Sequence, residues 1–286
     1  MRGAIGRVAF AGLAALLLAA RVPGGEPPKP ATASGTFEDR RFKLEIAGAY
    51  AYWDQKDGDA TLRVAVSNAQ LVAEALDDHY DRGHAIATLV ADDDVRVVTF
   101  DFDAKGRYEG LSYYFESGVG CGFCYDSKVR STVKAASGRL SGTVSYASDD
   151  RRFDVTFDVP VPPKSWGDAL PADGGAPGKA YLAYAAALER GDKAAVRALL
   201  DARAKERWDG HAADGDLDAY VEYLWHDVHT LMKTIRITGG FVRGDRAVVL
   251  LDGSSVFIDR LHGEALLRRE DGRWLVRAEM IDVGPR

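Results

Sequence analysis

The two cysteines of the 286-residue sequence, Cys121 and Cys124, lie in the stretch GVGCGFCYDSK. In a thioredoxin-type site such a pair follows a strand and opens a helix, whose N-terminus lowers the pKa of a thiol. The residues after Cys124 have instead the pattern of a turn followed by a strand. Two nearby cysteines in an oxidising compartment most often cross-link. We therefore predict a structural disulfide between Cys121 and Cys124.

Two alternatives for this cysteine pair stay open at the level of sequence. The thiols could remain free or redox-active, or they could bind a metal ion. A zinc site needs three or four ligands, and His79 and His84 are the imidazoles of the same half of the chain that could complete one. Both histidines are distant from the cysteines in sequence. The sequence therefore predicts no metal and no cofactor.

A second group of candidate residues lies in the last third of the chain. Tyr181 and Tyr184 are three residues apart, and Trp225 and His229 are four apart, so each pair shares one face of a predicted helix. Asp282 lies near the end of the last predicted strand. We predict that these five residues bind a ligand. No complete catalytic motif is present, so the catalytic residues stay unassigned.

Proton-transfer chemistry is the alternative use of the same residues. An isomerase or dehydratase needs a general base and a hydrogen-bond donor for a developing oxyanion. Asp282 or His229 could accept a proton, and one of the tyrosines could donate the hydrogen bond. The sequence leaves this activity open, but favours a protein that is not an enzyme.

The last predicted strand alternates between two sets of side chains. One set is Trp274, Val276, Ala278, Met280 and Asp282, and the other is Arg273, Arg277 and Glu279. The first set is more apolar, so we expect it to face the helices. This register predicts Asp282 at the rim of a pocket.

The elements that must position these residues follow from hydrophobic periodicity. After a linker at 162–177, rich in Pro, Gly and Ala, apolar residues recur with a helical period at 179–190, 192–208 and 217–232. Short strand patterns then continue to the C-terminus, and Asp271-Gly272 predicts a hairpin turn. Helices followed by an antiparallel sheet predict an α+β domain at 178–286.

The first half of the chain has a β pattern instead. Residues 36–161 contain short runs of β-branched and aromatic residues separated by turn signals, which predicts an antiparallel sandwich or barrel. Phe153, Val155, Phe157 and Val159 alternate with polar residues, as one buried face requires. One helical insertion is expected at 68–83. The predicted domain is otherwise all-β.

The N-terminus has the pattern of a secretory signal. Arg2 and Arg7 precede an apolar run at 8–20, which is shorter than the roughly 20 residues that span a bilayer. We predict a signal peptide at 1–25, a disordered spacer at 26–35, and a secreted or periplasmic protein with no membrane span after signal removal. The frequent Ala, Arg and Asp suggest a GC-rich bacterium.

The charge of the chain excludes one class of partner. The formal net charge is −6. A nucleic-acid-binding protein needs a basic face that displaces counterions from phosphates, and no cluster of Lys and Arg supplies one. We therefore expect no nucleic acid as a partner.

The C-terminal domain resembles a known superfamily. The stretch AYLAYAAALERGDKAAVRALL, followed at the end by GEALLRREDGRWLVRAEMIDV, is similar to the nuclear-transport-factor-2-like superfamily, of the SnoaL or cystatin-like cone type. The resemblance covers about 177–283. It implies three helices packed on a curved antiparallel sheet around a conical pocket. Members include isomerases, dehydratases, ligand-binding modules and dimerising domains. We identify no such resemblance for the N-terminal β domain.

The sequence therefore predicts two domains, an N-terminal all-β sandwich or barrel and a C-terminal α+β cone. The function that it favours is a secreted or periplasmic, non-enzymatic protein. Its cone would bind a small apolar ligand or a protein partner. The alternatives are a pocket enzyme, and an envelope assembly or dimerisation module that forms a homodimer.

Overall fold

A computed structural model describes residues 29–40, 43–54, 60–92, 95–115, 118–120, 128–224, 234–254 and 261–283. We refer to these as the described residues. The predicted signal peptide and both cysteines lie outside them. Among the described residues, no helix has both the length and the apolar character that crossing a bilayer requires.

The N-terminal half contains two antiparallel sheets. The first has the order β2-β1-β11-β10-β8, and β9 also pairs with β10. Its strands are β1 (Thr32–Asp39), β2 (Lys43–Ile46), β8 (Arg130–Ser131), β9 (Lys134–Ala136), β10 (Arg139–Ala147) and β11 (Arg151–Pro160). The second sheet runs in chain order through β3 (Gly48–Asp54), β4 (Thr61–Ser67), β5 (Val97–Phe102), β6 (Tyr108–Phe115) and β7 (Gly118–Gly120).

The core of this half lies between the two sheets. The inward residues of β11 are Phe153, Val155, Phe157 and Val159, at most 3% exposed, as the alternation of the sequence predicts. They belong to one apolar cluster with residues of the second sheet such as Phe100. The core of this half therefore lies between two facing antiparallel sheets, where the sequence had left a sandwich and a barrel open.

Helices cover the outer face of the second sheet. The helix α1 (Ala73–Leu76) and the longer α2 (Arg82–Asp92) bury Leu76, Ile86 and Val90 against Tyr50 and Tyr52 of β3. The strand β3 is therefore buried on both faces. The helical insertion expected at 68–83 contains α1, but most of α2 lies beyond it. The half is a β-sandwich with a helical layer, and not an all-β domain.

The C-terminal half contains the third sheet, also antiparallel, in the order β12-β13-β14-β15-β16. Its strands are β12 (Asp168–Ala169), β13 (Thr234–Arg243), β14 (Arg246–Ser254), β15 (Leu261–Glu270) and β16 (Arg273–Val283). The helices before β13 are α3 (Gly175–Glu189), α4 (Lys193–Ala198), α5 (Ala202–Asp214) and α6 (Leu217–Tyr223). The longest, α3, packs Tyr181, Tyr184 and Leu188 onto one face of the sheet.

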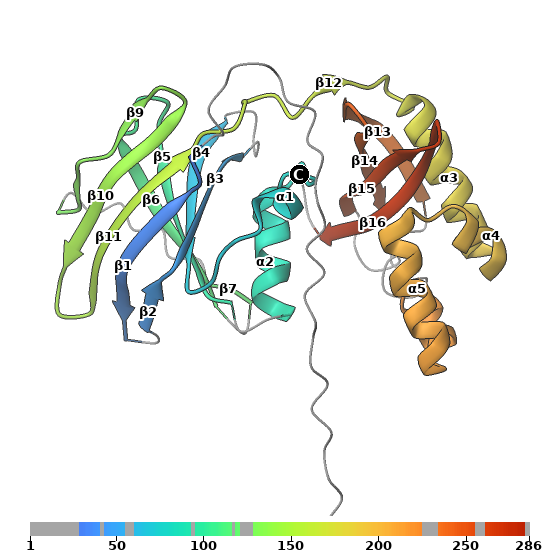
Figure 1. Ribbon diagram of the computed structural model, residues 1–286, viewed down its shortest axis with the longest axis horizontal. Coiled ribbons are helices and arrows are strands. Elements are labelled where there is room, and N and C mark those ends of the chain that lie inside the picture. Colours follow the sequence, from blue (N-terminus) through green and yellow to red (C-terminus); the bar gives the residue numbers. More distant parts are fainter. Residues whose placement is uncertain are drawn as a thin grey trace, which may run out of the picture.

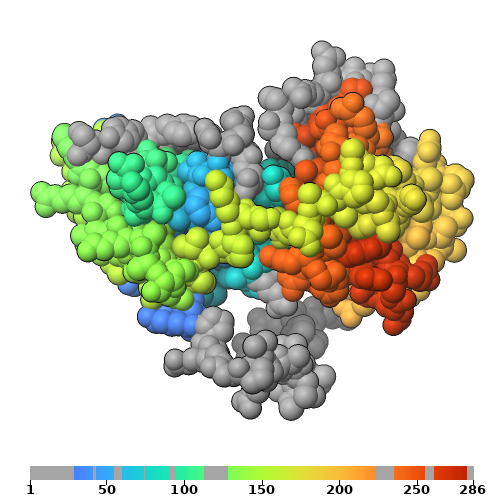
Figure 2. Space-filling model, turned by 90° about the horizontal axis from the view of Figure 1, so that it is seen from above, coloured from blue at the N-terminus to red at the C-terminus, as the bar shows by residue number. Residues whose placement is uncertain are grey.

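The other face of the third sheet packs against the N-terminal half. Figure 1 shows α1 and α2 between the second sheet and β16, with α3, α4 and α5 on the far side of the third sheet. Tyr80 stacks on Phe241 of β13 with ring centroids 5.0 Å apart, and Met280 of β16 packs against the cluster around α2. In Figure 2 the segment after β11 crosses from one half of the molecule to the other.

The predicted fold class was wrong. The described structure is mostly β, with 48% strand and 25% helix in three antiparallel sheets, and it has no clear cone of three helices on a sheet. The sheet of the C-terminal half is covered on both faces, by helices on one and by the N-terminal half on the other. Periodicity shows that a face is apolar but not which element covers it, so the sequence could not reveal this layer order.

The predicted second helix, 192–208, is also interrupted. Leu200 pairs with Val276 of β16, and the backbone of Val276 bonds to Leu199 and Asp201. Asp201 is the N-cap of α5, and its carboxylate accepts a hydrogen bond from the backbone N–H of Ala204. The chain therefore leaves the helical conformation between α4 and α5 to bond with a strand that is distant in sequence.

Candidate functional site

The structure brings together two of the five predicted ligand-binding residues. Tyr181 and Tyr184 lie on α3, at most 4% exposed, with ring centroids 6.4 Å apart. Trp225 and His229 lie outside the described residues. Asp282 is in β16, where its backbone lies opposite His262, and its side chain is not among those described.

A bulge in β16 reverses the predicted facing of its side chains. Leu267 pairs with Val276 and Leu266 with Ala278, so Arg277 is an extra residue in the ladder. Trp274 and Val276 face the helices as predicted, but Ala278 packs on the opposite face with Leu266. The assignment of Ala278 and Met280 to the helical face was therefore wrong, because one extra residue inverts the alternation beyond it.

The inversion places Glu279, which was not predicted as a functional residue, on the side of the helices. Both of its carboxylate oxygens are buried. Burial raises the pKa of Tyr181 and of Tyr184, and the nearby carboxylate of Glu279 raises both further. These phenols therefore stay protonated hydrogen-bond donors. No signal in the sequence marks the bulge, so Glu279 was missed.

A cleft lies elsewhere, at the junction of the two halves. It has a volume of about 490 Å³. Its walls come from β3, the loop before α1, the end of β11, the segment before β1 and the end of β13. The apolar part of the wall is formed by Pro30, Ala49, Ala51, Leu71, Pro160 and Pro162. Ligand pockets commonly occupy such places, because two units meet there without filling the space.

One end of the cleft carries a tyrosine and a carboxylate. The hydroxyl of Tyr50 donates to Oδ1 of Asp77 at 2.6 Å, and Nε of Arg82 lies 3.8 Å from the same oxygen. Burial raises the pKa of Tyr50, although the Arg82 guanidinium partly opposes this. The phenol therefore remains a neutral donor at the wall of the cleft, held by its bond to Asp77.

Arg243 projects into the cleft from the end of β13. Its Nη2 donates to the backbone oxygen of Asp77 at 2.8 Å, and the guanidinium lies 4.8 Å from the centre of the Trp166 ring. The Nε1 of Trp166 in turn donates to the backbone oxygen of His79 at 2.9 Å. These contacts fix the position of the guanidinium.

Two buried carboxylates hold the halves together next to the cleft. Asp78 accepts hydrogen bonds from three arginines of the C-terminal half, with shortest distances of 2.7 Å for Arg246, 2.9 Å for Arg268 and 3.1 Å for Arg277. This polar junction fixes the loop after α1 against β14, β15 and β16.

Glu264 makes the reciprocal contact from the C-terminal half. It is 2% exposed and accepts from the backbone N–H groups of Tyr80 and Asp81, both at 3.0 Å. Nδ1 of His79 lies 2.8 Å from its other oxygen. His79, considered above as a zinc ligand, is therefore engaged with Glu264. Among the described residues, no three His, Cys, Asp or Glu side chains are grouped so that they could hold a metal ion.

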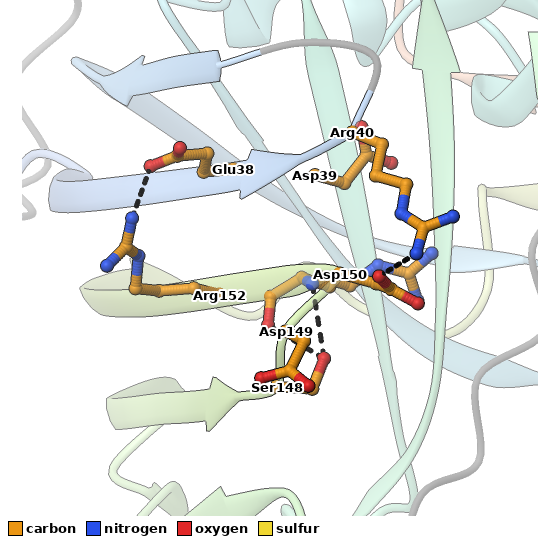
Figure 3. A pocket seen from close by; sticks show the side chains of 8 residues that line it. Glu38, Asp39, Arg40, Ser148, Asp149, Asp150 and Arg152 are labelled. Carbon is orange, nitrogen blue, oxygen red and sulfur yellow. Dashed lines mark hydrogen bonds and ion pairs between the residues drawn. The ribbon is translucent and has the colours of Figure 1, made fainter.

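A smaller hollow of about 240 Å³ lies at the opposite end of the sandwich. Figure 3 shows two ion pairs among its charged side chains, Glu38 with Arg152 and Arg40 with Asp150. The charges in these two exposed pairs offer little to a ligand, because each contacts both its partner and water.

The sequence did not predict the junction cleft. Its polar residues Tyr50, Asp77 and Arg243 lie far apart in the chain and form no motif. Comparison of the chain with models of protein families, with curated proteins and with solved structures gave no match.

Proposed function

We propose that the protein is a non-enzymatic binding protein that holds a small, largely apolar ligand in the junction cleft. The observation that carries this proposal is the cleft itself. Its volume of about 490 Å³ falls within the range of small-molecule sites, and apolar side chains with a few fixed polar groups line it.

The contacts around the cleft support a preformed site. Asp78 and Glu264 are buried and multiply hydrogen-bonded across the junction. A cleft between two units that are locked in this way needs little rearrangement to bind. Its ligand therefore loses less binding free energy to the ordering of the protein.

We propose further that the protein acts outside the cytoplasm. The charged start and the short apolar run of residues 8–20 support this location. The enzyme activity, the assembly role and the homodimer considered above stay predictions. The buried Glu279 beside Tyr181 and Tyr184 is where proton-transfer chemistry would be sought.

A neutral fluorescent probe tests the binding site. Ala73 is exposed on α1 and lines the cleft, so Ala73→Trp should fill the space with little cost in folding. We expect N-phenyl-1-naphthylamine to bind the wild type with increased fluorescence, and the variant to bind about tenfold more weakly, a loss of roughly 1.4 kcal/mol.

Ala213→Trp is the matched control, because Ala213 is exposed on α5 and does not line the cleft. It should bind the probe as the wild type does. Equal affinity in the wild type and Ala73→Trp, or no binding in the wild type, would contradict a ligand site in this cleft.

A further inference from the structure

We infer that the ligand of the junction cleft is an amphipathic anion, whose apolar body lies against the alanine, leucine and proline walls and whose carboxylate binds Arg243. This inference rests on the proposed binding function of the same cleft. It follows from how the charged groups around the cleft are paired.

Among the described residues, Asp77 is the one carboxylate that lines the cleft, and the protein already compensates its charge. Asp77 accepts the Tyr50 hydroxyl, and the guanidinium of Arg82, whose side chain is 4% exposed, lies against it. Because a buried cation and a phenol both face Asp77, this carboxylate is a weak partner for a cationic ligand.

Arg243 differs from Arg82 in its partners. Its contacts are a backbone carbonyl and the face of Trp166, and no carboxylate among the described residues pairs with it. A guanidinium has five N–H groups in a plane, and most of them remain after one bond to a carbonyl. Arginine binds carboxylates in a bidentate manner, and stacking on an aromatic ring fixes its plane.

Lys29 adds a second cation to the lining of the cleft. Nζ of Lys29 lies 2.6 Å from Oδ2 of Asp158, but that carboxylate also binds Nε of Arg139 at 2.6 Å. Two cations therefore share one carboxylate here. The chain as a whole has a net charge of −6, so the positive charge at the cleft is a local feature that favours an anion.

The apolar walls define the rest of the ligand. Leu71 is 9% and Ala51 2% exposed, and both line the cleft with the prolines. A strongly hydrated inorganic anion would gain nothing from these walls, whereas a medium-chain or aromatic carboxylate would bury its hydrocarbon part there. The chemistry of the cleft therefore matches a monocarboxylate with an apolar body.

Decanoate and 1-decanol form a suitable pair of competitors, since they share a chain length and differ in charge. Each is titrated against bound N-phenyl-1-naphthylamine at neutral pH. We expect the wild type to bind decanoate about tenfold more tightly than 1-decanol, as one charge-assisted contact allows. Added salt should weaken the binding of decanoate and leave that of 1-decanol unchanged.

The variant Arg243→Gln should lose about tenfold in affinity for decanoate and less than about twofold for 1-decanol. Arg243→Lys should recover part of the loss. Arg236→Gln is the control on the same strand, because Arg236 is 75% exposed and pairs with Asp252. It should bind both competitors as the wild type does.

Lys29→Gln provides a second route if Arg243→Gln fails to fold, which circular dichroism would show. This variant should lose about threefold in affinity for decanoate and none for 1-decanol, because Lys29 shares the carboxylate of Asp158 with Arg139 and is only partly neutralised by it.

Binding of the probe and of 1-decanol without preference for decanoate would overturn the anion inference and leave the binding function standing. Equal losses for both competitors in Arg243→Gln would also overturn it. Failure of the wild type to bind the probe or either competitor would overturn the binding function itself.

Discussion

Tyr50, Tyr181 and Tyr184 are buried phenols with pKa values raised above the ordinary value of 10.0, chiefly by burial. Each hydroxyl remains protonated in the folded protein over a pH range in which it ionises in the unfolded chain. The same burial that keeps Tyr50 a donor at the cleft therefore makes the fold sensitive to alkali.

The free energy of unfolding should fall as the pH rises above 10. A phenol whose pKa is higher in the folded than in the unfolded protein contributes its full stabilisation at pH values below the unfolded-state pKa. This contribution is lost as the pH rises toward the folded-state pKa. The slope is about 1.4 kcal/mol per pH unit for each such phenol. Urea unfolding at several alkaline pH values measures it.

Tyr184→Phe removes one of these phenols and should flatten the alkaline slope by about 1.4 kcal/mol per pH unit. The phenolate absorbance of the folded protein gives an independent measure, because the three buried groups should ionise only on unfolding. An unchanged slope in Tyr184→Phe would show that its phenol is not protected.

At the scale of elements, the bulge of β16 connects three parts of the fold. The extra residue, Arg277, binds Asp78 of the N-terminal half through Nη1 and Asp201, the N-cap of α5, through Nε. One irregular position thus joins the loop after α1, the last strand and the start of a helix. Arg277 carries this contact because the bulge turns the backbone at that point.

Asp78→Asn should uncouple the two halves. Asp78 faces three arginines and its side chain is 10% exposed, so loss of its charge removes the carboxylate that these largely buried cations share. We expect a loss of about 3 kcal/mol, and two unfolding transitions in calorimetry in place of one.

Asp245→Asn is the control for this charge change. Asp245 contacts Arg268 at 3.5 Å, but its side chain is 67% exposed. The substitution should alter stability by less than about 0.5 kcal/mol. If Asp78→Asn unfolds in one transition with the stability of the control, the junction is held by its apolar contacts instead.

At the scale of the whole molecule, the fold consists of successive layers (Figure 1). They are the two sheets of the sandwich, the helices α1 and α2, the third sheet, and the helices from α3 onward. Most of the residues that line the junction cleft belong to the N-terminal half, and Arg243 of β13 adds a wall from the C-terminal sheet. The C-terminal half supplies the guanidinium of Arg243 to this site. The location of the protein in the cell, by contrast, stays a prediction from its first residues.

Leu17→Arg should block export, because it places a charge in the middle of the apolar run at 8–20. In the native host, fractionation should then find the protein in the cytoplasm with its full-length mass. Leu182→Arg is the matched control, since Leu182 is 45% exposed in α3. If both variants are found in the same fraction as the wild type, the prediction of a signal peptide is contradicted.

Local patterns were sufficient for much of the secondary structure. The alternation of β11, the helix α3 and the hairpin at Asp271-Gly272 were all predictable, because each depends on neighbours a few residues away. At that hairpin both residues have positive φ, 49° and 78°, as the turn requires. The disulfide and the export of the protein stay predictions from the same local signals.

The sequence by itself determined the strand and helix periods, the absence of a basic cluster and the pattern of the N-terminus. Tertiary structure decided the break between α4 and α5 at Leu200, the bulge at Arg277, the facing of Glu279 and the layer order. It also decided the cleft, where Tyr50, Asp77 and Arg243 meet from distant parts of the chain. Each of these features depends on a contact between segments far apart in sequence, and periodicity records only whether a face is apolar, not its partner.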